Sequence, residues 1–136
     1  MLDPNTPDGA KGIALLEDAY VVWLTTVRPN GQPQSSPVWF VIDDDEFVIY
    51  SLDDTARVPN LETNPRVSLN LDSNAGADVV TVEGVARVVD GPPSTEDAAY
   101  QEKYRDGIRD IGHTPESFAG RYSVTLRIKP RRWRIH

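Results

Sequence analysis

Cysteine is absent from this chain of 136 residues, and histidine is almost absent. Without cysteine there is no disulfide, no thiolate nucleophile and no cysteine-ligated metal. The two histidines, His113 and His136, do not have the spacing of a metal-ligand motif. A Ser-His-Asp hydrolase would depend on one of them, and no GxSxG turn accompanies them. The sequence therefore predicts neither a metal centre nor a hydrolytic triad.

Long apolar runs are also missing. No stretch approaches the roughly 18 apolar residues of a membrane-spanning helix, and the first twelve residues, MLDPNTPDGAKG, lack the basic start and apolar core of a signal peptide. The length suits one domain, since a second would have too small a core. We therefore expect a single cytoplasmic domain over residues 1–136, with residues 1–9 flexible.

Acidic residues are missing from one end of the chain, although the net charge is −7. Residues 117–136 contain no Asp or Glu. Their basic residues are Arg121, Arg127, Lys129, Arg131, Arg132 and Arg134. The acidic body disfavours nucleic-acid binding, which needs net neutralisation of phosphates. The basic end fits either a compact anionic ligand or an edge strand protected by charge.

β-Branched and aromatic residues are concentrated in short segments that predict strands. These segments are residues 20–27, 34–42, 46–51, 66–71, 79–89 and 121–129. Pro29–Asn30–Gly31 and the polar run 43–46 predict hairpin turns. The run 38–42 is apolar throughout, which indicates burial on both faces, and Gly84 predicts a bulge or a close approach of another backbone.

Helical patterns are fewer. Apolar spacing predicts a helix over residues 10–18, and a second over 55–63 with Pro59 in its first turn. Ser94 and Asp97 predict the start of a helix that ends near Gly107, and residues 108–120 are expected to form a loop and a short helix. Pro130 predicts a turn into a final segment, 131–136.

Short antiparallel strands with few helices favour a closed or nearly closed barrel, and the GxGxxG of a Rossmann fold is missing.

Six motifs then occur in order along nearly the whole chain. They are TTVRPNGQPQSSPVWF (25–40), IYS (49–51), ARVPNLETNPRVSLNL (56–71), VTVEGVARVV (80–89), YQEKYRDGI (100–108) and PRRWR (130–134). This order resembles the pyridoxamine-phosphate-oxidase-like split β-barrels, and within them the actinobacterial F420-dependent branch. The resemblance implies a mainly β fold, a six-stranded antiparallel split barrel, and a homodimer with cofactor sites at the subunit interface.

The resemblance also implies the residues of the cofactor site. The backbone of Pro37, Val38, Trp39 and Phe40 is expected to contact the edge of a tricyclic ring, whereas without the resemblance Trp39 and Phe40 indicate barrel core. The phosphate-binding stretch is expected to contain Ser51, Thr55, Arg57, Val58 and Asn60. Lys129, Arg132 and Trp133 are expected to come from the second subunit, or Trp133 equally closes the rim of the barrel.

The phosphate-binding stretch agrees with elementary chemistry, because a helix N-terminus and an arginine both favour an anion. Spacing alone favours a simple helix cap with a surface arginine. The family commonly has lysine at the Arg57 position and further basic character beside it, where this chain has Pro59. Arginine still binds phosphate bidentately.

The function implied by the resemblance is an F420-dependent reductase. Such an enzyme transfers a hydride between the deazaflavin and an electron-poor acceptor such as an enone or quinone. No side chain is nominated as catalytic, and the proton is expected from a tyrosine such as Tyr104 or from water. Alternatives are an FMN-dependent oxidase or reductase of the same fold, a non-catalytic cofactor carrier, or a heme-binding barrel ligated by His113 or His136.

Overall fold

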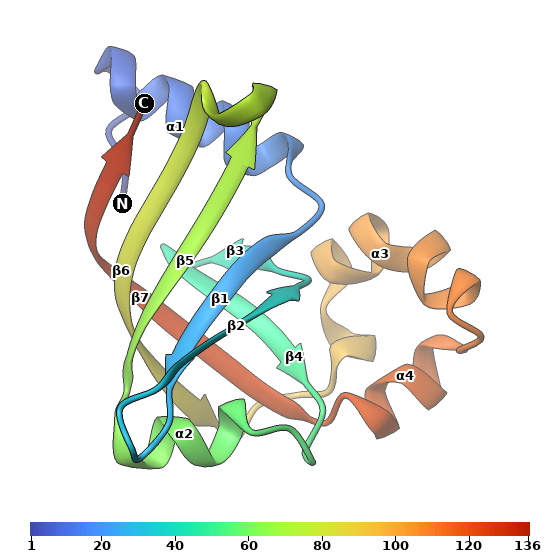
Figure 1. Cartoon of the computed structure of the whole chain (residues 1–136). Helices are drawn as coiled ribbons and strands as arrows, with labels where there is room; N and C mark the ends of the chain where they lie inside the picture. The colour runs from blue at the N-terminus through green and yellow to red at the C-terminus, as the bar shows by residue number, and fades with distance from the viewer.

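A computed structural model describes the backbone of residues 1–136 and every side chain except those of residues 72 and 73. Over this backbone, seven strands form one antiparallel sheet (Figure 1). The strands are β1 (Val22–Val27), β2 (Pro33–Val38), β3 (Val41–Asp43), β4 (Glu46–Ser51), β5 (Arg66–Ser73), β6 (Asp78–Val89) and β7 (Val124–Ile135). The helices are α1 (Pro7–Asp18), α2 (Arg57–Thr63), α3 (Ala98–Asp110) and α4 (Pro115–Arg121), with short 3-10 turns at Asn74–Gly76 and Ser94–Glu96.

The order of the strands explains why the sheet curls. It is β2-β1-β5-β6-β7-β4-β3, so β2 and β3 lie at opposite edges although only Trp39 and Phe40 separate them in the sequence. A flat sheet of this width would hold its edges roughly 28 Å apart, whereas the link from Val38 to Val41 reaches only about 11 Å. The sheet must therefore coil until its edges approach each other. The result is a split barrel that stays open, because β2 and β3 pair with β1 and β4 and not with each other.

Both predicted hairpin turns are confirmed. Gly31 adopts a φ of +87°, and the turn between β1 and β2 is held by the Arg28 N–H, which donates to the Gln32 carbonyl at 2.9 Å. Between β3 and β4, Asp44 and Asp45 have φ values of 51° and 61°. Two successive residues with positive φ match the right-handed twist of the flanking strands.

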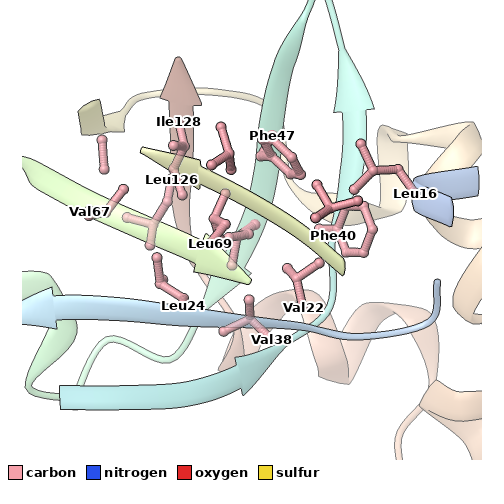
Figure 2. Close-up of a cluster of buried hydrophobic side chains, with 14 of the residues drawn as sticks. Leu16, Val22, Leu24, Val38, Phe40, Phe47, Val67, Leu69, Leu126 and Ile128 are labelled. Carbon is pink, nitrogen blue, oxygen red and sulfur yellow. The ribbon is translucent and has the colours of Figure 1, made fainter. Parts of the chain in front are cut away.

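The main core fills the barrel. Alternate residues of β1 point inward, where Val22 and Leu24 are almost fully buried. Figure 2 shows these side chains with Phe40 and Phe47, and with Leu16, which α1 contributes to the same cluster. Each buried aliphatic or aromatic side chain contributes roughly 1.5–3 kcal/mol. This core determines which side chains of each strand point into the barrel.

A second apolar cluster lies outside the barrel under α3 and α4, the two helices to the right of the sheet in Figure 1. In α3 the buried residues Tyr100, Tyr104 and Ile108 are four apart, so they share one helix face. They pack with Phe118 of α4 against β3 and β4. The Asp97 side chain caps α3 by accepting from the Tyr100 N–H at 3.0 Å.

Three strand predictions need correction. The expected six strands are seven, because segment 34–42 is interrupted at Trp39 and Phe40, where the chain crosses from one sheet edge to the other. The run 38–42 is nevertheless buried on both faces, as predicted: Phe40 lies in the main core and Trp39 packs on the α3–α4 cluster. Pro130 is not a turn, since β7 continues through it. The final strand begins at Val124 rather than at 121, because residues 115–121 form α4.

The bulge predicted at Gly84 is confirmed by a register shift between Glu83 and Gly84, where Gly84 faces Pro130. Proline lacks the N–H that a regular ladder requires, so a bulge is where a strand tolerates it.

The helix boundaries also differ slightly from the prediction. α1 begins at Pro7 with Thr6 as its N-cap, three residues before the predicted start, and the flexibility of residues 1–9 stays a prediction. α2 begins at Arg57 rather than at residue 55, and α3 continues to Asp110 beyond Gly107. No helix in the described backbone is long and apolar enough to cross a membrane.

Candidate functional site

Arg57 is the centre of the candidate site. It is the first residue of α2, next to the lower end of the barrel in Figure 1. Its Nη1 donates to the Ser51 hydroxyl at 3.3 Å, and its Nη2 donates to the Ser36 hydroxyl at 3.1 Å. The side chain is half-buried, and this burial lowers the pKa of the guanidinium. The two hydroxyls fix the guanidinium fork in one orientation.

The charge of Arg57 is not compensated by a carboxylate among the described side chains. The ion pairs of the structure involve other arginines: Arg87, Arg109, Arg121, Arg127 and Arg132. A half-buried cation that contacts only neutral hydroxyls retains its capacity to bind an anion. The charge of Arg57 is therefore available to a ligand, whereas the charges of these paired arginines are already compensated.

Arg57 lies at the wall of an aromatic cavity of about 320 Å³. The cavity is lined by Pro37, Val38, Trp39, Tyr50, Leu52, Arg57, Tyr100, Ile111, Phe118 and Tyr122. Pockets of this size with apolar walls and few polar groups are typical small-molecule sites. The structure thus brings together four of the predicted site residues: Pro37, Val38, Trp39 and Arg57.

Stacked rings make the walls of this cavity rigid. The Trp39 ring lies parallel to that of Tyr104, with centroids 4.6 Å apart and an interplanar angle of 3°. Phe118 stacks on Trp39 at 5.8 Å and on Tyr122 at 4.2 Å. Offset stacking of this kind adds roughly 0.5–1.5 kcal/mol a pair beyond burial. The cavity is consequently preformed.

Tyr104 holds the two-residue link in place. Its hydroxyl accepts from the Phe40 N–H at 2.8 Å and lies 2.8 and 2.9 Å from the carbonyl oxygens of Tyr20 and Phe40, to which it donates. Burial raises the pKa of this hydroxyl. The side chain is fully buried. Tyr104 therefore has a structural role, and its proton is not accessible to a molecule in the cavity.

Tyr100 is the one residue lining this cavity whose buried side-chain hydroxyl finds no hydrogen-bond partner among the described groups. Burial raises the pKa of this hydroxyl. A buried polar group without a partner costs about 1–3 kcal/mol. In a native structure such a group calls for an explanation, and a role in binding is one of them.

The remaining predicted residues of the phosphate-binding stretch lie around the cavity rather than in its wall. Asn60 is buried, and its Nδ2 donates to Thr26 Oγ1 at 3.1 Å and to Gln34 Oε1 at 3.0 Å. These bonds dock α2 on β1 and β2. Thr55 bonds the Leu52 carbonyl at 3.4 Å, and Val58 is half-buried. Ser51 contacts Arg57, as given above.

The predicted residues near the C-terminus lie on β7, beside β6. Lys129 is exposed, and Arg132 forms a loose ion pair with Glu83 at 3.8 Å. The Trp133 ring packs on that of Phe47 with centroids 6.0 Å apart. They are not among the lining residues of the Arg57 cavity. Their role in the site of a second copy stays a prediction.

Sequence reasoning missed Ser36, Tyr100 of α3 and Phe118 of α4. Ser36 pairs with Leu24, and Gln34 with Thr26, so these polar residues share the inner face of the sheet. An inward polar residue next to apolar neighbours was the available signal. The four-residue spacing of Tyr100 and Tyr104 likewise marked one helix face.

The histidines do not assemble a metal site. His113 Nδ1 lies 2.9 Å from Ser117 Oγ at the turn between α3 and α4, and His136 is exposed at the C-terminus. Among the described side chains, no three His, Asp or Glu residues are close enough to hold a metal ion.

A curled sheet with one unpaired arginine beside an aromatic cavity defines a split barrel with a candidate small-molecule site. A family model described as pyridoxamine 5'-phosphate oxidase matches residues 11–136, and the chain belongs to this family. No curated protein matches the chain.

Solved structures share the fold at low sequence identity. One is HutZ, the heme storage protein from Vibrio cholerae, with a TM-score of 0.68 and 16% identity, covering 96% of this chain and 95% of that one. An F420 reductase aligns with a TM-score of 0.66 and 24% identity, covering 89% and 94%. An FAD-binding protein from Mesorhizobium loti aligns with a TM-score of 0.67 and 17% identity, covering 91% and 88%. Proteins of this fold thus bind different cofactors.

Proposed function

We propose that the chain is an oxidoreductase that binds the deazaflavin coenzyme F420 and transfers a hydride between it and an electron-poor organic molecule such as an enone or quinone. The observation that carries this proposal is the Arg57 guanidinium, held by two hydroxyls at the wall of an aromatic cavity and free of any described carboxylate. The structural likeness to an F420 reductase supports the choice of cofactor.

The residues of the site fit such a cofactor. A planar guanidinium binds phosphate with two parallel hydrogen bonds, and the Ser36 hydroxyl, which accepts from Arg57, can donate its own proton beside it. The stacked walls of Trp39 and Phe118 fit a flat ring system. The arrangement therefore offers a phosphate end and a ring end within one continuous site.

In the proposed reaction the residues of the chain bind the cofactor and orient its ring. The bound deazaflavin supplies the carbon that accepts or donates the hydride. Arg57 holds the phosphate, and the aromatic walls orient the ring, which favours transfer over a short distance. Because the Tyr104 hydroxyl is bonded to backbone groups, we assign the proton of the reaction to solvent water.

We further propose a homodimer in which Lys129, Arg132 and Trp133 of a second copy extend the site. F420 carries an acidic tail beyond its phosphate, so its site needs positive charge over a long path. The acid-free end of the chain supplies that charge. On β1, Trp23 has 51% of its surface exposed, and a large exposed aromatic side chain favours a subunit contact.

The test is a binding titration of the purified protein with F420 and with FMN. We expect F420 to bind more tightly. Arg57→Ala should weaken F420 binding by at least about 1.5 kcal/mol, or roughly tenfold, the lower range for a lost charged hydrogen bond. Arg66→Ala, which removes an exposed arginine from the start of β5, is the matched control and should bind as the wild type does.

Two outcomes would change the assignment. Equal or tighter binding of FMN would move it to an FMN-dependent enzyme of the same fold. Tight F420 binding without oxidation of the reduced cofactor by menadione would indicate a carrier rather than a reductase.

The second candidate function is non-catalytic heme binding. It is favoured by the likeness to HutZ and by the position of His113, whose ring lies 6.0 Å from that of Phe118 and 6.2 Å from that of Tyr122. Both of these aromatic residues line the Arg57 cavity. Titration with hemin should then give a sharp Soret band that is lost in His113→Ala. No such band would reject this candidate.

A further inference from the structure

Lys103 of α3 is a half-buried cation outside the Arg57 cavity. Its Nζ donates to the Phe40 carbonyl at 3.0 Å and lies 3.8 Å from the centroid of the Phe40 ring. Lys11, in contrast, forms an ion pair with Asp78 at 2.8 Å. No ion pair within the described side chains involves Lys103. An ammonium group has three N–H donors, and the chain uses one of them.

This ammonium group is part of the lining of a cavity of about 360 Å³. The apolar lining residues come from α1, from the β2–β3 link and β3, and from α3: Ile13, Leu16, Phe40, Val41, Ile42 and Ala99. Met1 and Glu17 complete the lining. No residue is shared with the Arg57 cavity. In Figure 2, Leu16 and Phe40 mark the part of the main core that this cavity adjoins.

The surroundings of Lys103 leave its charge poorly balanced. The carbonyl and the aromatic ring stabilise the ammonium form. Burial nevertheless dominates and lowers the pKa of Lys103 to about 8. A ligand carboxylate beside Nζ would accept the unused N–H donors and restore the balance of charge. The apolar walls would bury the hydrocarbon part of the same ligand.

We propose that this second cavity binds an apolar monocarboxylate, whose carboxylate pairs with Lys103 and whose hydrocarbon chain lies against Ile13, Leu16 and Phe40. The site provides one cation, and Glu17 adds a negative charge to the lining. This combination favours a single carboxylate over a dianion or a phosphate. The cavity volume lies within the usual range for small organic ligands.

The test is a calorimetric titration of the full-length protein with sodium octanoate, and with octanol as the uncharged analogue. Octanoate should bind saturably and more tightly than octanol. Lys103→Met should weaken octanoate binding at least about tenfold, as expected for a lost charged hydrogen bond, and leave octanol binding unchanged. Lys103→Arg should retain most of the affinity, since it keeps the charge. Glu17→Gln should strengthen binding.

Two controls separate this site from others. Lys11→Met removes the same charge from a paired surface lysine and should bind octanoate as the wild type does, and so should Arg57→Ala. Ala99→Phe fills the cavity while Lys103 is retained, so it should abolish binding even if Lys103→Met does not fold. Equal affinities for octanoate and octanol, or undiminished binding by either the Lys103→Met or the Ala99→Phe protein, would overturn the proposal.

Discussion

At the scale of single residues, two arrangements of arginine in the structure have different consequences. Arg57 is held by neutral hydroxyls and keeps its charge available for a ligand. Arg87 and Arg127 instead converge on one carboxylate, that of Glu46, which is only 13% exposed. The first arrangement serves binding, because the charge is oriented but not compensated. The second serves stability, because Asp43 also pairs with Arg127 at 3.0 Å, so that two positive charges face two negative ones.

The Glu46 cluster predicts a pH-dependent stability. Hydrogen bonding from Arg87, opposed by burial and assisted by Arg127, lowers the pKa of Glu46 to about 2, compared with about 4.3 for an unperturbed glutamate. Because the folded pKa is the lower one, the stabilisation is complete above about pH 4.3 and is lost as the pH falls toward 2. Urea unfolding at pH 6 and pH 2.5 should show a larger loss for the wild type than for Glu46→Gln.

Glu46→Gln should also lower the free energy of unfolding at pH 6 by about 1–3 kcal/mol, since among the described side chains Arg87 loses its ion-pair partner and Arg127 keeps only Asp43. Glu102→Gln, which removes an exposed carboxylate outside the described ion pairs, should behave as the wild type does at both pH values. Parallel losses for the wild type and Glu46→Gln would contradict this account of the cluster.

At the scale of elements, the sequence predicted strands and turns correctly where their conformation depends on neighbouring residues. The strand expected at 46–51 is β4 without change, and both hairpin turns occur at the expected residues. The predictions failed where long-range geometry decides. The pattern of 34–42 gives no sign of the edge-to-edge crossing at Trp39, and Pro130 lies in a strand because Gly84 on β6 provides the bulge opposite it. The sequence around Pro130 does not show that Gly84 lies opposite it, and the sequence around Gly84 does not show Pro130.

The same limit applies to the candidate site. Arg57, Ser51 and Trp39 were identified through their motifs, and they meet around one cavity. The contribution of Ser36 and of the aromatic face of α3 depends on the barrel's curl and on the docking of α3, which no local pattern encodes. Tyr104 gives the clearest case: its hydroxyl bonds backbone groups of residues 20 and 40.

The bulge leads to a prediction at this scale. A Cβ on Gly84 would lie 2.8 Å from Ile128 Cγ2 and 3.0 Å from the Lys129 carbonyl oxygen. Gly84→Ala should therefore lower the free energy of unfolding by about 1–3 kcal/mol through overpacking, as measured by urea denaturation. At Gly91 a Cβ would meet nothing within 4 Å, so Gly91→Ala is the matched control and should not destabilise. Equal stability of the two variants would reject the packing argument.

At the scale of the whole molecule, the proposed dimer predicts a mass in solution. Light scattering should give twice the 15.1 kDa of one chain. Trp23 projects from β1 opposite Pro37 of β2 and Asn70 of β5. Trp23→Arg should shift the mass toward the monomer and weaken cofactor binding together, because the proposed site needs a second copy. Trp23→Phe should keep the dimer. A monomeric wild type that binds the cofactor tightly would refute the shared site.

The two-residue link between β2 and β3 has a consequence for how this fold can vary in evolution. Trp39 and Phe40 set the closure of the barrel, and their alternation directs one ring to each of two cavities. A single inserted or deleted residue in this link would exchange the cavities to which the two rings point. It would also alter the circumference of the barrel. Length changes in related sequences should thus accumulate at the Asp44–Asp45 turn and in the loop around Gly91, while the spacing from Val38 to Val41 stays constant.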